Sequence, residues 1–203
     1  MCQGAHRHFT FLFLYVIMNI MFTTLESAKT PEGLTSLETP RLILKPLTTA
    51  HAADIYRLVT SSGDLHLYTH IPEYYTEDDA RTWVEKHAGS PYFFVLTDRA
   101  TGEAMGVVSM VEYVRSHRRA EIGSWLGRQY RGQGLMAEAL RAMVHDMLEK
   151  TEIEKIIARV LAGNEASAKT LENAGFKEEA LLPKYEYHNG EMKDIRIFAI
   201  NKS

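Results

Sequence analysis

The chain has 203 residues, of which 45% are hydrophobic and 24% are charged. These values are typical of a globular protein with a buried core, so they exclude global disorder and argue against a multi-domain protein. Lysine and arginine total 23 and aspartate and glutamate total 26, which gives a formal net charge of −3. Because this charge provides no broad positive surface, nucleic acid is not expected as a partner.

Cysteine usage also limits the chemistry. Cys2 is the only cysteine in the sequence. No intramolecular disulfide and no cysteine-rich zinc site can therefore form, which favours a reducing compartment. A catalytic thiol is not expected either.

Residues 9–22 form an almost entirely apolar run near the N-terminus. The run is shorter than the roughly 20 residues of a membrane-spanning helix, and its length fits the apolar part of a secretory signal. The flanks fit a signal poorly, because only Arg7 and two histidines precede the run and no convincing cleavage motif follows. Three interpretations stay open: an upstream extension with translation starting at Met18 or Met21, a signal or anchor, and a buried N-terminal element.

A polar segment at residues 23–39 follows this run. It contains Pro31, Gly33 and several serine and threonine residues, a composition typical of a linker. The sequence therefore divides into an N-terminal segment with linker at residues 1–38 and a folded domain at residues 39–203. No stable membrane span is expected.

The spacing of apolar residues predicts strands and helices throughout the domain. Thr48 is expected to cap the first helix, and Thr76 with Asp79 forms a variant capping box for the second. Asn189 and Gly190 predict a hairpin turn. In chain order we expect a strand at 41–47, helices at 49–60 and from 76 past 87, strands at 92–96, 105–113 and 121–126, a helix at 135–150, a strand at 155–161, a helix at 165–173 and strands at 185–187 and 195–200.

The order of these elements predicts the fold class. A strand, a long helix and a second strand at residues 121–161 imply a βαβ unit. The three strands before it read as a meander. We therefore expect a mixed α/β or α+β domain with a central mixed sheet and about four flanking helices, without internal repeats.

The segment Gln129-Tyr130-Arg131-Gly132-Gln133-Gly134-Leu135-Met136 lies between a predicted strand and the long helix. Its two glycines expose the backbone at a helix entrance, where the first N–H groups lack intrahelical partners and the helix dipole is positive. Such a turn can bind a phosphate or pyrophosphate. It can equally be a helix start that needs glycine only for its backbone angles.

Three classes of phosphate-binding protein have such a turn. A P-loop is excluded, because the sequence contains no Gly-x4-Gly-Lys-Ser/Thr motif. Gly132-x-Gly134-x-x-Ala137 formally matches the dinucleotide fingerprint, but no carboxylate follows the next strand, which ends before Asn164. The third class binds acyl-coenzyme A, whose pyrophosphate requires the same backbone amides.

Several motifs around this turn are typical of one enzyme family. Gln129-x-x-Gly132-x-Gly134 matches the signature Gln/Arg-x-x-Gly-x-Gly/Ala at its three fixed positions, and residues 120–126 match the strand before it. Asn164-x-x-Ser167 matches the exit of the next strand. On these motifs, residues 39–201 resemble the GNAT superfamily of N-acetyltransferases.

Leu171 stands where many members of this superfamily have a tyrosine. With the Asn164-x-x-Ser167 motif, this feature is similar to the branch that includes ribosomal-protein N-terminal acetyltransferases. The resemblance implies acetyl-CoA as co-substrate and no metal. It implies the cofactor-binding residues Trp125, Leu126, Gln129, Arg131, Gly132, Gln133, Gly134, Leu135, Met136 and Asn164.

The resemblance also implies catalytic roles. An amine attacks an acyl group only when it is unprotonated, so a nearby proton acceptor assists. Glu121 is the candidate general base, and its alternative is a structural carboxylate paired with Arg118 or Arg119. Because leucine cannot donate a proton, protonation of the CoA thiolate passes to Ser167, whose alternative is to satisfy the backbone at a helix start.

Two further groups of residues have weaker signals. His66-x3-His70 would bring two imidazoles together on a helix, as in some metal sites, but Gly63 and Pro72 flank the pair, so loop positions without a metal are expected. The tyrosines fall in regions where the family builds its acceptor cleft, although tyrosines at sheet ends are also ordinary core-rim residues. They are Tyr68, Tyr74, Tyr75, Tyr185 and Tyr187.

The activity implied by the resemblance is direct transfer of an acetyl group from acetyl-CoA to a primary amine in the cytoplasm. The favoured acceptor is a protein N-terminus. The alternatives are a small-molecule amine acetyltransferase, a dinucleotide-binding enzyme and a catalytically silent CoA-binding module. The oligomeric state stays open, with a homodimer among the options.

No predicted element of the domain requires residues 9–22. A chain that begins at Met21 is therefore expected to fold, to bind acetyl-CoA as tightly as the 203-residue chain and to keep its transfer rate. Calorimetry and a transfer assay on both chains check this expectation. Loss of folding on truncation would contradict it, as would a native species cleaved after about residue 28 and found outside the cytosol.

Overall fold

The computed structural model describes residues 35–203, so the predictions for the apolar run and most of the linker lie outside the described residues. The described strands form one mixed sheet in the order β1-β2-β3-β4-β5-β6-β8-β7. The strands are β1 (Leu37–Glu38), β2 (Leu42–Pro46), β3 (Phe93–Asp98), β4 (Ala104–Val114), β5 (Arg119–Leu126), β6 (Lys155–Leu161), β7 (Lys177–His188) and β8 (Glu191–Asn201). The α-helices are α2 (Ala52–Ser62), α3 (Glu77–His87), α4 (Leu135–Lys150) and α5 (Glu165–Asn173). The expected fold class is confirmed.

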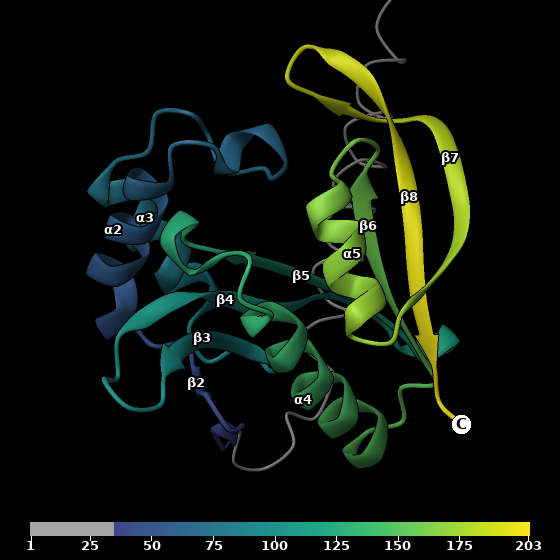
Figure 1. The fold of residues 1–203 in the computed structure, drawn as a ribbon, viewed down its shortest axis with the longest axis horizontal. Helices are drawn as coiled ribbons and strands as arrows, with labels where there is room; N and C mark the ends of the chain where they lie inside the picture. The colour runs from purple at the N-terminus through teal and green to yellow at the C-terminus, as the bar shows by residue number, and fades with distance from the viewer. Residues whose placement is uncertain (1–34) are drawn as a thin grey trace, which may run out of the picture.

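The sheet consists of two parts that meet between β5 and β6. Strands β2 to β5 form an antiparallel meander, and α4 connects β5 to the parallel strand β6, as the βαβ prediction requires. Pairing between β5 and β6 covers three positions and stops at Glu121 opposite Ile157. Beyond this point the two strands diverge, and Figure 1 shows β6, β8 and β7 turned away from the meander.

A β-bulge lies beside the point of divergence. On β4, Met110 pairs with Ile122 and Glu112 pairs with Glu121, so Val111 is an extra residue on the bulged strand. A bulge bends its strand and increases the local twist. The bulge therefore contributes to the fork at the position where β5 leaves β6.

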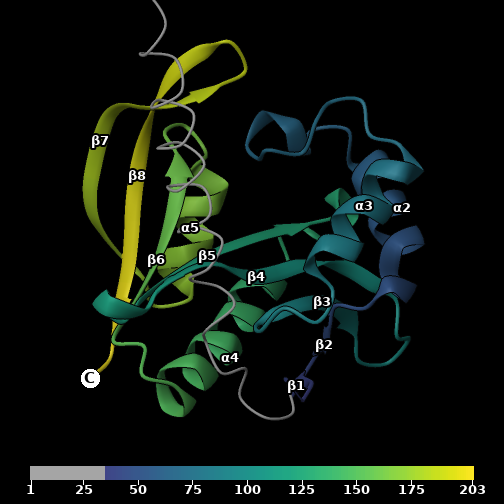
Figure 2. The same ribbon diagram turned by 180° about the vertical axis from the view of Figure 1, so that it is seen from behind.

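Apolar side chains alternate along the central strands and build a core on each face of the sheet. Phe94 and Leu96 of β3 belong to one buried cluster with α4, whereas Phe93 and Val95 belong to a second cluster with α2 and α3. Successive side chains of a strand point to opposite faces, which explains this division. Figure 2 shows α2 and α3 together, apart from α4. Both faces of the meander are thus covered, and its strands are fixed in place.

Local sequence signals agree with most helix and turn boundaries. Thr76 and Asp79 form the expected capping box, with Asp79 N–H donating to Thr76 Oγ1 at 3.2 Å. Helices α4 and α5 and strand β6 have the predicted bounds. Asn189 and Gly190 have φ values of 48° and 88°, the left-handed conformations that a tight hairpin turn needs.

Several boundaries differ from expectation. Thr48 caps a short 3-10 turn, Thr49–His51, and α2 starts only at Ala52. Strand β7 starts at Lys177, earlier than predicted. Its polar residues and proline are not typical of a strand in the sequence, but a strand at the edge of a sheet tolerates them. Strand β1 lies in the segment expected to be a linker. No helix within residues 35–203 has the length and apolar character to cross a bilayer.

Candidate functional site

A cleft of about 1590 Å³ occupies the fork between the two parts of the sheet. Its walls come from β4, β5 and β6, from the starts of α4 and α5, and from the loop at residues 63–75. Pockets for a single small ligand usually measure about 300–1,000 Å³. The volume therefore provides room for two reactants, one in each arm of the fork.

The glycine-rich turn lies at one end of the cleft. Gly132 and Gly134 have φ values of 74° and 73°, and α4 begins directly afterwards. Within residues 35–203, no group accepts a hydrogen bond from the N–H groups of residues 132–137. A Cβ atom on Gly132 would meet no atom within 4 Å, so the space above this turn is open. Free amides, a helix dipole and open space together form a cradle for an anionic phosphate group.

Arg41 adds positive charge beside this cradle, and the sequence reasoning missed it. Its Nη1 donates to the carbonyl oxygen of Gln133 at 2.9 Å, and its Nε donates to Glu138 Oε2 at 2.7 Å. Burial pushes the pKa of Glu138 upward, but hydrogen bonds from Thr39 and Arg41 outweigh burial and leave that pKa below its ordinary value. Glu138 therefore stays charged and holds the guanidinium at the turn.

Arg131 has a positioning role that the sequence did not indicate. Its Nη1 and Nη2 form a bidentate pair with Asp64 at 2.8 and 2.9 Å, and its Nε donates to the carbonyl oxygen of Leu126 at 3.0 Å. The hydrogen bond from Arg131 lowers the pKa of Asp64 below its usual range. The side chain of Arg131 thus ties the turn to the loop at residues 63–75 and occupies part of the expected cofactor edge.

The structure brings most of the predicted cofactor residues to the cleft. Gln129 and Gln133 do not line the cleft. Gln133 Nε2 instead donates a hydrogen bond to the carbonyl oxygen of Gln129 at 3.3 Å, within the turn itself. The predicted residues that do line the cleft are Trp125, Leu126, Arg131, Gly132, Gly134, Leu135, Met136 and Asn164.

Glu121 lies at the fork, lines the cleft and has only 9% of its surface exposed. The expected alternative partners are wrong, because Arg118 pairs with Glu154 and Arg119 pairs with Glu112. Glu121 Oε1 instead accepts a hydrogen bond from Arg159 Nε at 2.7 Å. Its Oε2 accepts none from the described residues. One carboxylate oxygen is therefore anchored and the other is available to a reactant.

Arg159 is held between two carboxylates. Its Nη1 lies 3.2 Å from Glu186 Oε2, in addition to the bond with Glu121. Burial opposes the charged form of Arg159, yet the hydrogen bond and charge of Glu121 raise its pKa above the ordinary value. The guanidinium therefore remains charged and fixes both acidic side chains.

The start of α5 forms another wall of the cleft. Asn164 Oδ1 accepts a hydrogen bond from the N–H of Ser167 at 3.1 Å, so asparagine, and not the serine hydroxyl, caps this helix. The Ser167 hydroxyl has no hydrogen-bond partner within residues 35–203, and the residue lines the cleft. Leu171 is buried one turn further along. The Ser167 hydroxyl is thus open to the cleft, and leucine, not tyrosine, occupies position 171.

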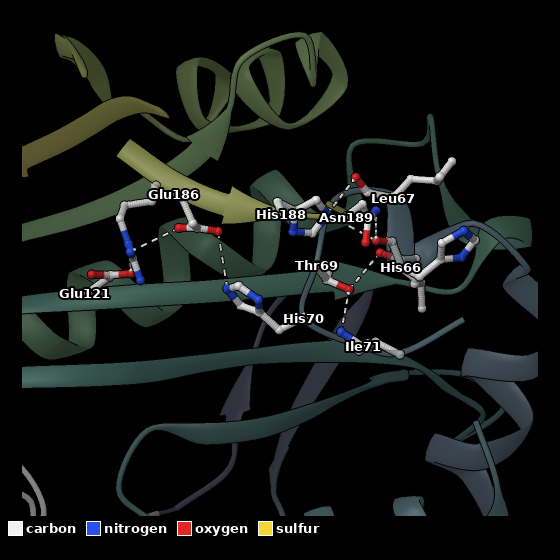
Figure 3. A network of polar contacts seen from close by, with 11 residues as sticks. His66, Leu67, Thr69, His70, Ile71, Glu121, Glu186, His188 and Asn189 are labelled. Atoms are coloured by element: carbon white, nitrogen blue, oxygen red, sulfur yellow. Dashed lines mark hydrogen bonds and ion pairs between the residues drawn. The ribbon is translucent and has the colours of Figure 1, made fainter. Parts of the chain in front are cut away.

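The other arm of the cleft contains polar residues from the loop at 63–75 and from β7. Figure 3 shows His70 and Glu186 pointing toward one another, with His70 Nε2 3.3 Å from Glu186 Oε1. The side chain of His66 does not join this group, since residues 65–67 form a 3-10 turn and only its carbonyl contacts His188. The helical His66-x3-His70 pair is therefore absent from the described structure.

The predicted tyrosines divide between the cleft and the outer surface. Tyr68 and Tyr75 line the cleft, and burial together with the charge of Asp79 raises the pKa of Tyr75 to about 12. Tyr185 and Tyr187 do not line it, because strand alternation turns them away from Glu186 and His188, which do. Tyr74 is exposed and also lies outside the lining.

Comparison with known proteins identifies the family. Residues 41–177 match the family described as "Acetyltransferase (GNAT) domain". The chain belongs to the GNAT family. The expected resemblance is thereby confirmed, and the chain is an N-acetyltransferase, as are the relatives that share this domain.

Among GNAT relatives, the ribosomal-protein-serine acetyltransferase of Escherichia coli is 25% identical over 156 residues, covering 73% of this chain and 86% of the relative. The [ribosomal protein uS5]-alanine N-acetyltransferase of E. coli is 32% identical over 113 residues, covering 55% and 58%. The solved structure of RimL, a ribosomal L7/L12 alpha-N-protein acetyltransferase in complex with coenzyme A, has a TM-score of 0.75 at 22% identity and covers 82% of this chain and 98% of RimL. This likeness shows the GNAT fold.

Replacement of Gly134 by valine tests the phosphate cradle. A β-branched side chain should obstruct the approach of the pyrophosphate, and we expect the dissociation constant for acetyl-CoA to rise at least tenfold, about 1.4 kcal/mol. Gly102→Val is the matched control, because Gly102 has a similar φ of 77° in the turn between β3 and β4, away from the cleft. Calorimetry with acetyl-CoA on both folded variants measures the two dissociation constants. Equal affinity in the two variants would refute the cradle.

Proposed function

We propose that the chain transfers the acetyl group of acetyl-CoA to the α-amine of a protein N-terminus. The observation that carries this proposal is the arrangement of the cleft, with unpaired amides at one end and a buried carboxylate at the fork. Relatives that act on ribosomal proteins support the acceptor class. The same proposal gives the domain as residues 39–203, to which the described strand β1 adds residues 37–38, and gives the compartment as the cytoplasm.

The chain's own groups account for donor binding. Acetyl-CoA supplies the activated acetyl thioester, and the N–H groups of residues 132–137 with the positive end of α4 bind its pyrophosphate. The edge of β5 beyond Glu121 is unpaired on the β6 side and can hydrogen-bond the pantetheine arm as an added strand would. The side-chain amide of Asn164 retains its N–H donors for the same arm.

Proton transfers are assigned to Glu121 and Ser167. As the amine nitrogen bonds to the acetyl carbon and the carbon–sulfur bond breaks, Glu121 Oε2 accepts the proton lost by the amine. The Ser167 hydroxyl gives its proton to the departing thiolate and is reprotonated from water, and Glu121 returns the amine proton to water, so the net reaction moves one proton from the amine to the thiol. Arg159 has a positioning role, since it holds the other oxygen of Glu121 at 2.7 Å.

Two features favour a peptide α-amine, the first over a lysine side chain and the second over a small amine. The pKa of an α-amine is about 7.7–8.0, compared with about 10.4 for lysine, so more of it is unprotonated at neutral pH. In addition, Tyr68 and Val111 are large apolar side chains that line the cleft and remain exposed, which suits contact with the residues that follow the amine.

A panel of acceptors tests the proposal. We expect the kcat/KM for peptides with a free N-terminal serine or alanine to exceed, at least tenfold, the values for N-blocked peptides with an internal lysine and for small polyamines. Release of CoA is the readout. Higher values for small amines would establish the alternative acceptor class, and acetyl-CoA binding without thiol release for any amine would establish the silent module.

Glu121→Gln tests the general base. We expect turnover to fall by roughly 10²-fold or more with little change in acetyl-CoA affinity, because the amide cannot accept the proton. Glu112→Gln is the matched control, since Glu112 lies opposite Glu121 on β4 but does not line the cleft. Rates are measured from pH 6 to 9. Activity within a factor of three of wild type across this range would make Glu121 a structural carboxylate.

A further inference from the structure

A second group of polar side chains lies in the arm of the cleft opposite the glycine-rich turn. One ligand atom from each of His70, Glu186 and His188 lies within 4.8 Å of the others. Figure 3 shows the three side chains converging from the loop and from β7. We infer that they form a binding site for a divalent transition-metal ion of the Zn²⁺ class.

The hydrogen bonds of His188 leave one ring nitrogen ready to bind a metal. The residue is only 5% exposed, and its Nε2 lies 3.1 Å from the carbonyl oxygen of Leu67 and 3.2 Å from that of His66. A carbonyl oxygen can only accept, so Nε2 carries the hydrogen, and the lone pair of the neutral ring is on Nδ1. No described residue donates to Nδ1. Metal-binding histidines are commonly oriented in this way, by a hydrogen bond from the second ring nitrogen to a backbone carbonyl.

Glu186 is also oriented to bind a metal ion. Its Oε2 accepts from Arg159 at 3.2 Å, which leaves Oε1 directed at His70. The distance of 3.3 Å between Oε1 and His70 Nε2 is close to the spacing of about 3.3 Å between two ligands of a tetrahedral zinc ion with bonds of about 2.0–2.1 Å. His70 has 75% of its side chain exposed and can move toward the third ligand without disturbing the core.

The donor set identifies the class of ion. Two imidazoles and one carboxylate suit zinc and neighbouring first-row metals, whereas magnesium and calcium prefer oxygen ligands alone. Three protein ligands leave a fourth position for water. Because all three residues line the cleft, that position is accessible from the side assigned to the acceptor.

A bound cation would affect the acceptor. It would engage Glu186 beside the charged Arg159 and add positive charge to this arm, which opposes entry of a protonated amine. This consequence rests on the proposed function, whereas metal binding itself does not.

Titration of the metal-free full chain with Zn²⁺ against a chromophoric chelator, and with Co²⁺ followed by its absorption, tests the site. We expect one ion bound through this cluster, and His70→Ala and Glu186→Gln should each raise its dissociation constant at least tenfold. His66→Ala is the matched control, because His66 contributes only a backbone carbonyl that the variant retains. Unchanged Zn²⁺ affinity in folded His70→Ala, or no tetrahedral Co²⁺ spectrum in wild type, would overturn the inference.

Acetyl transfer gives a second, separable readout. Wild-type activity should be inhibited by Zn²⁺ and restored by chelator, while His70→Ala should need at least tenfold more Zn²⁺ for the same inhibition. Binding is measured without acetyl-CoA or acceptor. An absence of transfer activity would therefore count against the proposed function and leave the metal titration to decide the site.

Discussion

The site depends on the early end of pairing between β5 and β6. Parallel neighbours in a sheet normally share hydrogen bonds along their length, and here they share them only as far as Glu121. The rest of β5 is fully paired with β4 on one side and unpaired on the other. Backbone groups without a partner must be satisfied by water or by a ligand. The fork therefore creates an edge with strand-like hydrogen-bonding capacity, and the βαβ connection brings the unpaired amides of α4 to the end of that edge.

The ion pairs at the fork follow from this geometry. Where the strands part, inward-facing side chains of β5, β6 and β7 meet across the opening, and Glu121, Arg159 and Glu186 form a line of alternating charge. A buried carboxylate without a partner would be costly, so Arg159 allows Glu121 to stay in a largely enclosed position. The same arginine contacts only one oxygen of each carboxylate, so Oε2 of Glu121 faces the cleft and Oε1 of Glu186 faces His70. The ion pair with Arg159 is thus compatible with the proposed role of Glu121 as general base.

Sequence reasoning predicted the parts of this structure that depend on neighbours in the chain. Helix α4 could be located to the residue from its apolar spacing. The bounds of α5 were also predicted, although its cap is Asn164 and not Ser167. The glycine-rich turn could likewise be recognised in the sequence. The sequence did not predict the pairs Glu121–Arg159 and Arg131–Asp64. Each joins residues that are distant in the sequence and become neighbours only through the fork. The sequence predicts loop positions without a metal for His66 and His70, and the fold places His70 near Glu186 and His188, which lie far away in the chain.

The loop at residues 63–75 connects the two parts of the sheet where β5 and β6 are no longer paired. At its start, Asp64 binds Arg131 on the side of the meander and α4. Further along, the carbonyls of His66 and Leu67 accept from His188 of β7, and His70 meets Glu186 of the same strand. Hydrogen bonds contribute about 0.5–1.5 kcal/mol each and more when charged, so this set can hold the two parts of the sheet at a fixed opening. The loop at residues 63–75 therefore contacts both the glycine-rich turn and the opposite arm of the cleft.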